Sequence, residues 1–477
     1  MVFIEEGGER YLYYTSFVEA LTMGPDDDHH MMVLTFSCIG VKILKARDRF
    51  FPNLKALLIT PSVFQNFDAI LPEIAEPLQY LTLMMQDDLT DVPALARLAE
   101  LDVKLLHLEL CRCKFDHSLF KTYLAPALKS QKNLCILHVE LLMSTVHDFF
   151  LVLHSLPRLQ ELHLETEKRE DVGGKYSYSV SDIRKLSPKR IKSFHGLFQL
   201  KPEMDTVLRV ASESNISFDY MECTVRWASR PHQIEDLMDN IARRHSKVQK
   251  VVYCETDLMA IPAVIPHLPP MSEFCTASSN ISALFKLSSL RELVLTLFGT
   301  LVITPEFLEQ LADGCPSLQI CHLSPEKRIL PDHPRGGYWS LTLMDVVRFV
   351  LRMPRMTLLG VLFDASKPSS SCSELPALGS SNTLELLHVG SSAINDAEYV
   401  SSAFSQYFPG LKIIGTHLHP ESSLPPSTFQ SETEVELWER VRRLLFKDNK
   451  AWPWMNFSRA NRSDPIARAR NVQLVFE

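Results

Sequence analysis

The feature that most constrains the fold is a short phrase, Leu-x-x-Leu-x-Leu with aliphatic substitutes, that recurs along the chain. Its clear early copies start at Leu54, Leu78, Val103, Leu134 and Leu159, at intervals of 24, 25, 31 and 25 residues. The remaining copies start at these positions: Leu290, Met356, Leu384 and Leu411, and in weaker form Val18, Ile191, Val248, Met271 and Leu318. A period of about 20–30 residues indicates stacked structural units instead of one central core.

Segments with helical spacing lie between most copies. Apolar residues from Leu119 to Leu128 recur at i, i+4 spacing. Thr304 precedes a proline at the favoured first position of a helix, and Ser144 and either Asn395 or Asp396 are expected N-caps. The unit is therefore strand, turn, helix, turn, and strands joined by such crossovers are parallel.

The expected strands alternate between apolar and polar residues, as in Leu106–Leu110 and Leu162–Glu165. A doubly wound sheet, which is covered on both faces, has continuously apolar strands instead. We therefore predict an α/β leucine-rich-repeat solenoid with irregular repeats: a horseshoe with a parallel concave sheet and convex helices.

The predicted domain organisation is a solenoid over 1–430, followed at 431–477 by a C-terminal capping helix and a basic tail. The repeats are weakest over 200–285, where either degenerate repeats or an inserted subdomain fits the sequence. Residues 432–447 are expected to form the amphipathic capping helix, with Trp438 and Leu444 among the residues on its apolar side. Loops rich in Pro, Ser and Gly are expected at 325–340, 364–381 and 419–431.

Bulk properties exclude several classes of protein. A net charge of −8 argues against a general nucleic-acid binder, because phosphate neutralisation requires a basic surface. The N-terminus lacks the apolar segment of a secretory signal, and the longest apolar run, 293–303, is too short to span a bilayer. The ten cysteines are scattered and form no Cys-x-x-Cys pair. We expect an intracellular protein, cytoplasmic or nuclear, with no membrane or nucleic-acid partner.

Catalytic motifs are absent from the sequence. It contains no GxGxxG, HExxH or GxSxG, and Gly173-Gly174-Lys175 lacks the spacing of a phosphate-binding loop. The run 26–30, DDDHH, is interpreted as a solvated loop. We predict no enzymatic activity, no cofactor and no metal site.

The positions between the leucines predict a polar surface. In four successive copies the residue inside the final Leu-x-Leu is histidine, and two residues later glutamate follows in three of them. If these positions are in register, neighbouring histidines lie about 4.8 Å apart across the sheet. The expected partner-binding residues on the concave face are His107, His138, His163, His195, Glu109, Glu140 and Glu165. His322 and His388 occupy the same position in later copies.

Three interpretations of these columns remain open. They are a repeat consensus in which histidine offsets neighbouring glutamates, part of a surface that recognises a protein partner, or a zinc site. The residue types suit zinc, but a flat grid of side chains does not supply tetrahedral geometry.

A proline stands two residues before the first leucine in four copies: 51–54 (FPNL), 156–159 (LPRL), 315–318 (CPSL) and 408–411 (FPGL). With its irregular repeats, this chain resembles the F-box/leucine-rich-repeat proteins of mushroom-forming fungi. Tyr11–Met23 is similar to the segment that opens the repeats there. The resemblance implies a substrate receptor of a cullin-based (SCF) ubiquitin ligase.

The F-box, the helical module that would precede the repeats, is not expected here, because only about ten residues come before them. We therefore expect either a truncated start or a repeat-only relative, and a ligase adaptor as partner only if an upstream F-box exists. The alternatives are a free-standing leucine-rich-repeat scaffold with no ligase link and a GTPase activator built on such repeats, which would need an Arg or Asn presented at a rim.

Overall fold

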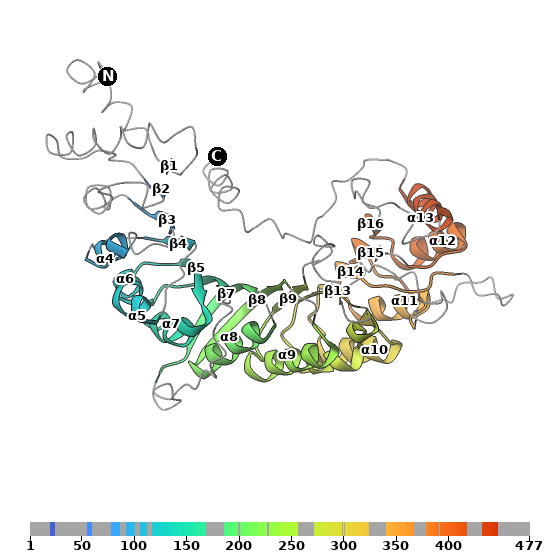
Figure 1. The fold of residues 1–477 in the computed structure, drawn as a ribbon. Coiled ribbons are helices and arrows are strands. Elements are labelled where there is room, and N and C mark those ends of the chain that lie inside the picture. Colours follow the sequence, from blue (N-terminus) through green and yellow to red (C-terminus); the bar gives the residue numbers. More distant parts are fainter. Residues whose placement is uncertain are drawn as a thin grey trace, which may run out of the picture. The chain divides into compact units, whose positions relative to one another are not determined.

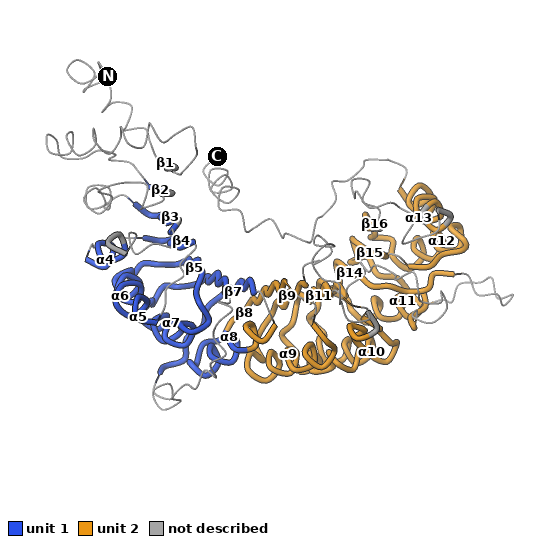
Figure 2. Tube along the Cα trace, in the orientation of Figure 1, with its two compact units in different colours: residues 1–199, 206–217, 460–477 blue, residues 200–205, 218–459 orange. Residues whose placement is uncertain are grey.

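The computed structural model of the chain describes residues 20–23, 55–59, 78–85, 92–100, 105–111, 117–167, 186–198, 201–226, 229–255, 271–297, 299, 301–323, 340–366, 378–390, 392–416 and 432–446. The chain divides into two compact units (Figure 2). Unit 1 comprises residues 1–199, 206–217 and 460–477, and unit 2 comprises residues 200–205 and 218–459. Helix α8 (Lys201–Glu213) and strand β8 (Ile216–Val225) contribute residues to both units.

Unit 1 is built on parallel strands that lie side by side in chain order (Figure 1). The strands are β1 (Ala20–Met23), β2 (Ala56–Ile59), β3 (Tyr80–Met84), β4 (His107–Cys111), β5 (Ile136–Leu142), β6 (Glu161–Glu167) and β7 (Lys189–Phe198). The helices between them are α4 (Val92–Glu100), α5 (His117–Leu119), α6 (Ala125–Ser130) and α7 (Val146–Leu153). A π-helical turn, Phe120–Leu124, joins α5 to α6, and a 3₁₀ turn, Met143–Thr145, precedes α7.

Unit 2 repeats the same arrangement. Its parallel strands follow the order β8, β9 (Lys250–Glu255), β11 (Glu292–Thr296), β13 (Ile320–Leu323), β14 (Leu358–Gly360), β15 (Leu386–Gly390) and β16 (Ile413–Thr416). Its helices are α9 (Pro231–Arg244), α10 (Pro305–Gly314), α11 (Leu343–Arg352), α12 (Ala397–Tyr407) and α13 (Glu432–Leu445). The 3₁₀ segments Met271–Phe274 and Ser278–Lys286 and a short separate sheet of β10 (Thr276–Ala277) and β12 (Leu301–Val302) complete it. The predicted α/β class with a parallel sheet is confirmed.

In each unit the helices lie along one side of the strands (Figure 1). On β5 and β11 the second and third apolar residues of the repeated phrase point to that side: Leu137 and Val139 of β5 are fully buried, as are Leu293 and Leu295 of β11. Because side chains alternate along a strand, the residues between them point to the opposite face. The repeated phrase thus places the core on one face and the predicted polar columns on the other.

The weaker copies that start at Val248 and Leu318 pair in the predicted register. Leu293 of β11 aligns with Val251 of β9 on one side and with Cys321 of β13 on the other. The alignment continues through Leu359, Leu387 and Ile414. The copy expected at Met271 is wrong, since Met271–Phe274 is a 3₁₀ helix.

Two helix starts agree with the sequence and one does not. The Thr304 hydroxyl accepts a hydrogen bond from the Phe307 amide at the start of α10, and the Asp396 carboxylate does the same for the Tyr399 amide of α12. The expected cap at Ser144 is wrong: Ser144 lies inside the 3₁₀ turn, and α7 starts at Val146 with no side-chain cap. The Thr145 hydroxyl donates to the carbonyl of Leu142 instead.

The predicted capping helix is α13. The Trp438 side chain is fully buried against Phe363 and Phe404, and its Nε1–H donates to the carbonyl of Ser392 over 2.9 Å. Leu444, which was expected on the apolar side, is 49% exposed. The predicted basic tail, the acidic run 26–30 and Gly173-Gly174-Lys175 lie outside the described residues.

Among the described residues, every helix is too short or too polar to cross a membrane.

Candidate functional site

The predicted histidine column forms on the strands β5, β6 and β7 of unit 1. His138 is aligned with His163, and His163 with His195, on adjacent parallel strands. The rings of His163 and His195 stack, with centroids 4.4 Å apart and planes inclined by 9°. The His138 ring lies 5.6 Å from that of His163. This part of the column agrees with the strand spacing used to predict it.

The first strand of the column is shifted by two residues from the prediction. Glu109, not His107, aligns with His138, because β4 follows a phrase that starts at Leu105 instead of Val103. Leu105, Leu108 and Leu110 are fully buried, as this register requires. His107 falls in the adjacent column, where it aligns with Tyr80 and Ile136.

The shift places Glu109, which was predicted in the glutamate column, in the histidine column, where it forms hydrogen bonds with both of its neighbours. The Glu109 carboxylate accepts from Nδ1–H of His138 at 2.8 Å and from the Thr82 hydroxyl at 3.1 Å. Thr82, Glu109, His138, His163 and His195 therefore occupy one register position across β3 to β7. We call these five residues the polar row.

Exposure along the polar row is uneven. Glu109 and His138 are buried, at 5% and 7% exposed, so the expectation of an open histidine column is wrong at this end. The side chains of His163 and His195 keep 25% and 24% of their surface. Glu140 and Glu165 are aligned with each other one step further along the strands and are half-buried. The accessible part of the polar row is therefore the His163–His195 end.

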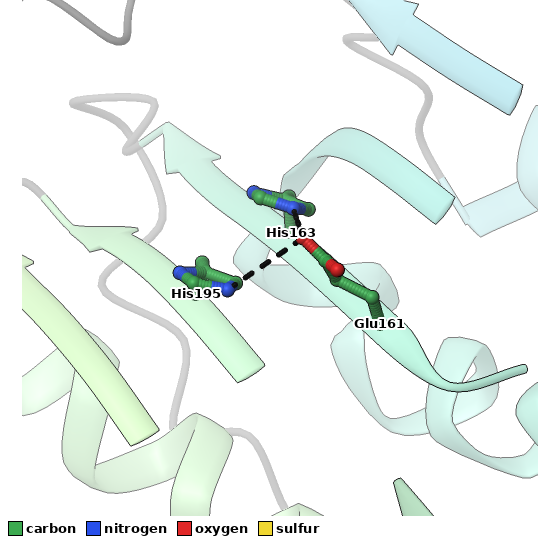
Figure 3. Close-up of side chains that lie close together, drawn as sticks. All are labelled: Glu161, His163 and His195. Carbon is green, nitrogen blue, oxygen red and sulfur yellow. Dashed lines mark hydrogen bonds and ion pairs between the residues drawn. The ribbon is translucent and has the colours of Figure 1, made fainter. Parts of the chain in front are cut away.

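Glu161 is a residue that the sequence analysis missed. It precedes His163 by two positions on β6, so both side chains lie on the same face of the strand. Its Oε1 lies 2.6 Å from His163 Nε2 and 3.7 Å from His195 Nε2 (Figure 3). The sequence did contain a signal for Glu161: it is a polar residue directly before Leu162, the second leucine of the copy that carries His163.

The protonation states in this cluster follow from its burial. Desolvation lowers the pKa of His163 to about 4, against the raising effect of its hydrogen bond to Glu161. The hydrogen bond from His163 lowers the pKa of the Glu161 carboxyl. At neutral pH a neutral imidazole therefore donates Nε2–H to an ionised carboxylate.

A second pair of predicted histidines meets in unit 2. His322 of β13 and His388 of β15 both align with Gly360 of β14, which lies between them. Their rings meet over the glycine, with His322 Nε2 2.9 Å from His388 Nδ1. His322 is fully buried and His388 is 8% exposed. Their burial makes this pair a structural contact within unit 2.

Neither the scan against protein-family models nor the search of curated proteins returns a match for this chain.

Proposed function

We propose that this chain is a non-enzymatic leucine-rich-repeat protein that binds a protein partner through the sheet face opposite its helices. The observation that carries the proposal is the accessible end of the polar row, where Glu161, His163 and His195 hold one another in position. Side chains fixed in this way lose little conformational entropy when a partner binds, which favours recognition.

The resemblance to fungal F-box/leucine-rich-repeat proteins supports a more specific role, that of substrate receptor in a cullin-based ubiquitin ligase. In this role the sheet face selects the substrate, and an adaptor binds a separate helical module of the full-length protein. The core-forming repeats common to both units support a recognition solenoid, since such folds bind partners along their sheets.

The test is affinity purification of the tagged full-length protein, with identification of the co-purifying proteins. The receptor role predicts that a ligase adaptor and cullin co-purify together with substrate proteins. The double variant His163→Asn, His195→Asn should retain adaptor and cullin but lose the substrates. His232→Asn is a matched control, because His232 is exposed on α9 of unit 2.

The outcomes separate the alternatives. Recovery of partners without adaptor or cullin contradicts the receptor role and supports a free-standing scaffold. Unchanged recovery of every partner by the double variant contradicts recognition through the polar row.

A further inference from the structure

We propose that Glu161, His163 and His195 form a binding site for a divalent transition-metal ion of the zinc type. Within the part of the chain that the structure describes, these residues are the one group of three whose potential ligand atoms all lie within 4.8 Å of one another. The proposal does not depend on a protein partner.

The placement of the three residues on the sheet supports a metal site. Glu161 and His163 are two residues apart on β6, and His195 is the register partner of His163 on β7. Two ligands along one strand and a third across from it form a triangle (Figure 3). A single row of histidines, the arrangement expected from the sequence, lacks this triangle, and Glu161 supplies its third corner.

The donor set also fits. Two imidazole nitrogens and one carboxylate oxygen make up one of the ligand sets of three-ligand zinc sites, in which the fourth position holds water. Imidazole ligands favour zinc, copper and nickel, whereas magnesium and calcium prefer all-oxygen sites. A neutral imidazole is the form that ligates a metal, and burial keeps His163 in that form near neutral pH.

The carboxylate oxygen now occupies the place that an ion would take. Oε1 of Glu161 lies between the two Nε2 atoms, at 2.6 Å and 3.7 Å. Zinc ligands lie at about 2.0–2.2 Å, so the carboxylate has to withdraw and the two rings have to tilt out of their parallel stack. The Nε2 proton of His163 is released to solvent while Nδ1 takes one up, which leaves the ring neutral. The partial exposure of all three side chains permits these rotations.

The remaining polar row supports one edge of the site. His138 packs beside His163 and is itself fixed by the Glu109 carboxylate. A ring packed beside a ligand limits the side-chain conformations that the ligand can adopt. His138 therefore restricts the movement of His163 from the buried side.

The experiment uses the purified full chain after removal of metals with a chelator. Zinc binding is measured by calorimetry, and Co²⁺ is added separately so that its visible absorption reports the coordination geometry. We expect one ion per chain and an intense tetrahedral cobalt spectrum. Glu161→Gln, which preserves the shape of the side chain, and His195→Asn should each weaken binding by at least about tenfold. His232→Asn should bind as the wild type does.

A second measurement distinguishes the loss of a zinc ligand from misfolding of a variant. Zinc should raise the thermal unfolding temperature of the wild type and of His232→Asn, but not that of Glu161→Gln, which is first shown by circular dichroism to be folded. Equal zinc affinity in the wild type and Glu161→Gln would overturn the site. A wild-type cobalt spectrum that stays octahedral and weak, as for ions held loosely by surface groups, would do the same.

Discussion

His245 is a buried histidine whose environment makes stability depend on pH. It follows the last turn of α9, is 2% exposed, and its ring stacks on Phe218 with centroids 5.4 Å apart. Among the described residues neither ring nitrogen has a hydrogen-bond partner. Burial, together with the neighbouring Arg244 charge, lowers its pKa to about 4. The folded protein therefore holds this ring neutral under conditions in which the unfolded chain protonates it.

This gives the first prediction, for His245→Phe. An unfolded histidine binds its proton near pH 6.5 and the folded one near pH 4. The unfolded state is therefore favoured as pH falls through this window, by up to about 3 kcal/mol at its lower end. The variant lacks this loss, so its free energy of unfolding should fall less than that of the wild type between pH 7 and pH 4.5.

Urea unfolding at a series of pH values measures the difference. His232→Asn, on the exposed face of the same helix, should follow the wild-type pH dependence. If His245→Phe loses as much stability as the wild type over the same range, His245 is not the titrating group.

At the scale of elements, a single glycine, Gly360 on β14, determines how the strands β13, β14 and β15 pack. A Cβ added to Gly360 would lie 2.3 Å from Cδ2 of His322, well inside contact distance. The glycine on β14 is what lets the rings of His322 and His388 meet across it.

The second prediction is that Gly360→Ala destabilises unit 2 by roughly 1–3 kcal/mol, because the buried His322 ring must move and its hydrogen bond to His388 is lost. The measurement is a double-mutant cycle in urea. In a His322→Ala background the same glycine substitution should have a much smaller effect, since the clashing ring is gone. Additive effects of the two substitutions would show that the clash is not the cause.

The register of the elements shows how far the sequence could predict the site. Apart from the copy expected at Met271, strong and weak copies on the described strands aligned correctly where one start satisfied the pattern, as at Val248. At β4 two starts, Val103 and Leu105, satisfy it. A one-residue slip would move the leucines to the wrong face, but a two-residue slip keeps them on the core side, so hydrophobicity does not distinguish the two starts. That ambiguity misplaced His107 and Glu109.

Other features of the site depend on contacts between strands that the pattern of apolar residues in the sequence does not reveal. Glu161 occupies an x position of the repeated phrase that was not assigned to either polar column. Its proximity to His195 arises only when β6 and β7 pair. The burial of Glu109 and His138 likewise has no counterpart in the alternation of polar and apolar residues, which assigns both to the open face. The class of fold followed from periodicity, whereas the chemistry of the site required tertiary structure.

At the scale of the whole molecule, the strand of each repeat pairs with the strands of the repeats before and after it in both units. This pairing predicts that a structural defect in one repeat affects mainly its neighbours. In repeat proteins stability is approximately a sum of repeat and nearest-neighbour terms, so a defect loosens adjacent repeats more than distant ones.

Trp438 on α13 is a suitable probe, because its buried ring contacts Phe363 and Phe404. We expect Trp438→Ala to raise amide hydrogen exchange in α12, β15 and β16, with little change in β4 to β6 of unit 1. Hydrogen exchange followed by mass spectrometry measures this segment by segment, and Leu444→Ala, at the exposed position of the same helix, should leave exchange unchanged. A uniform increase across both units would show that the chain unfolds as one cooperative body and would contradict the proposed repeat architecture.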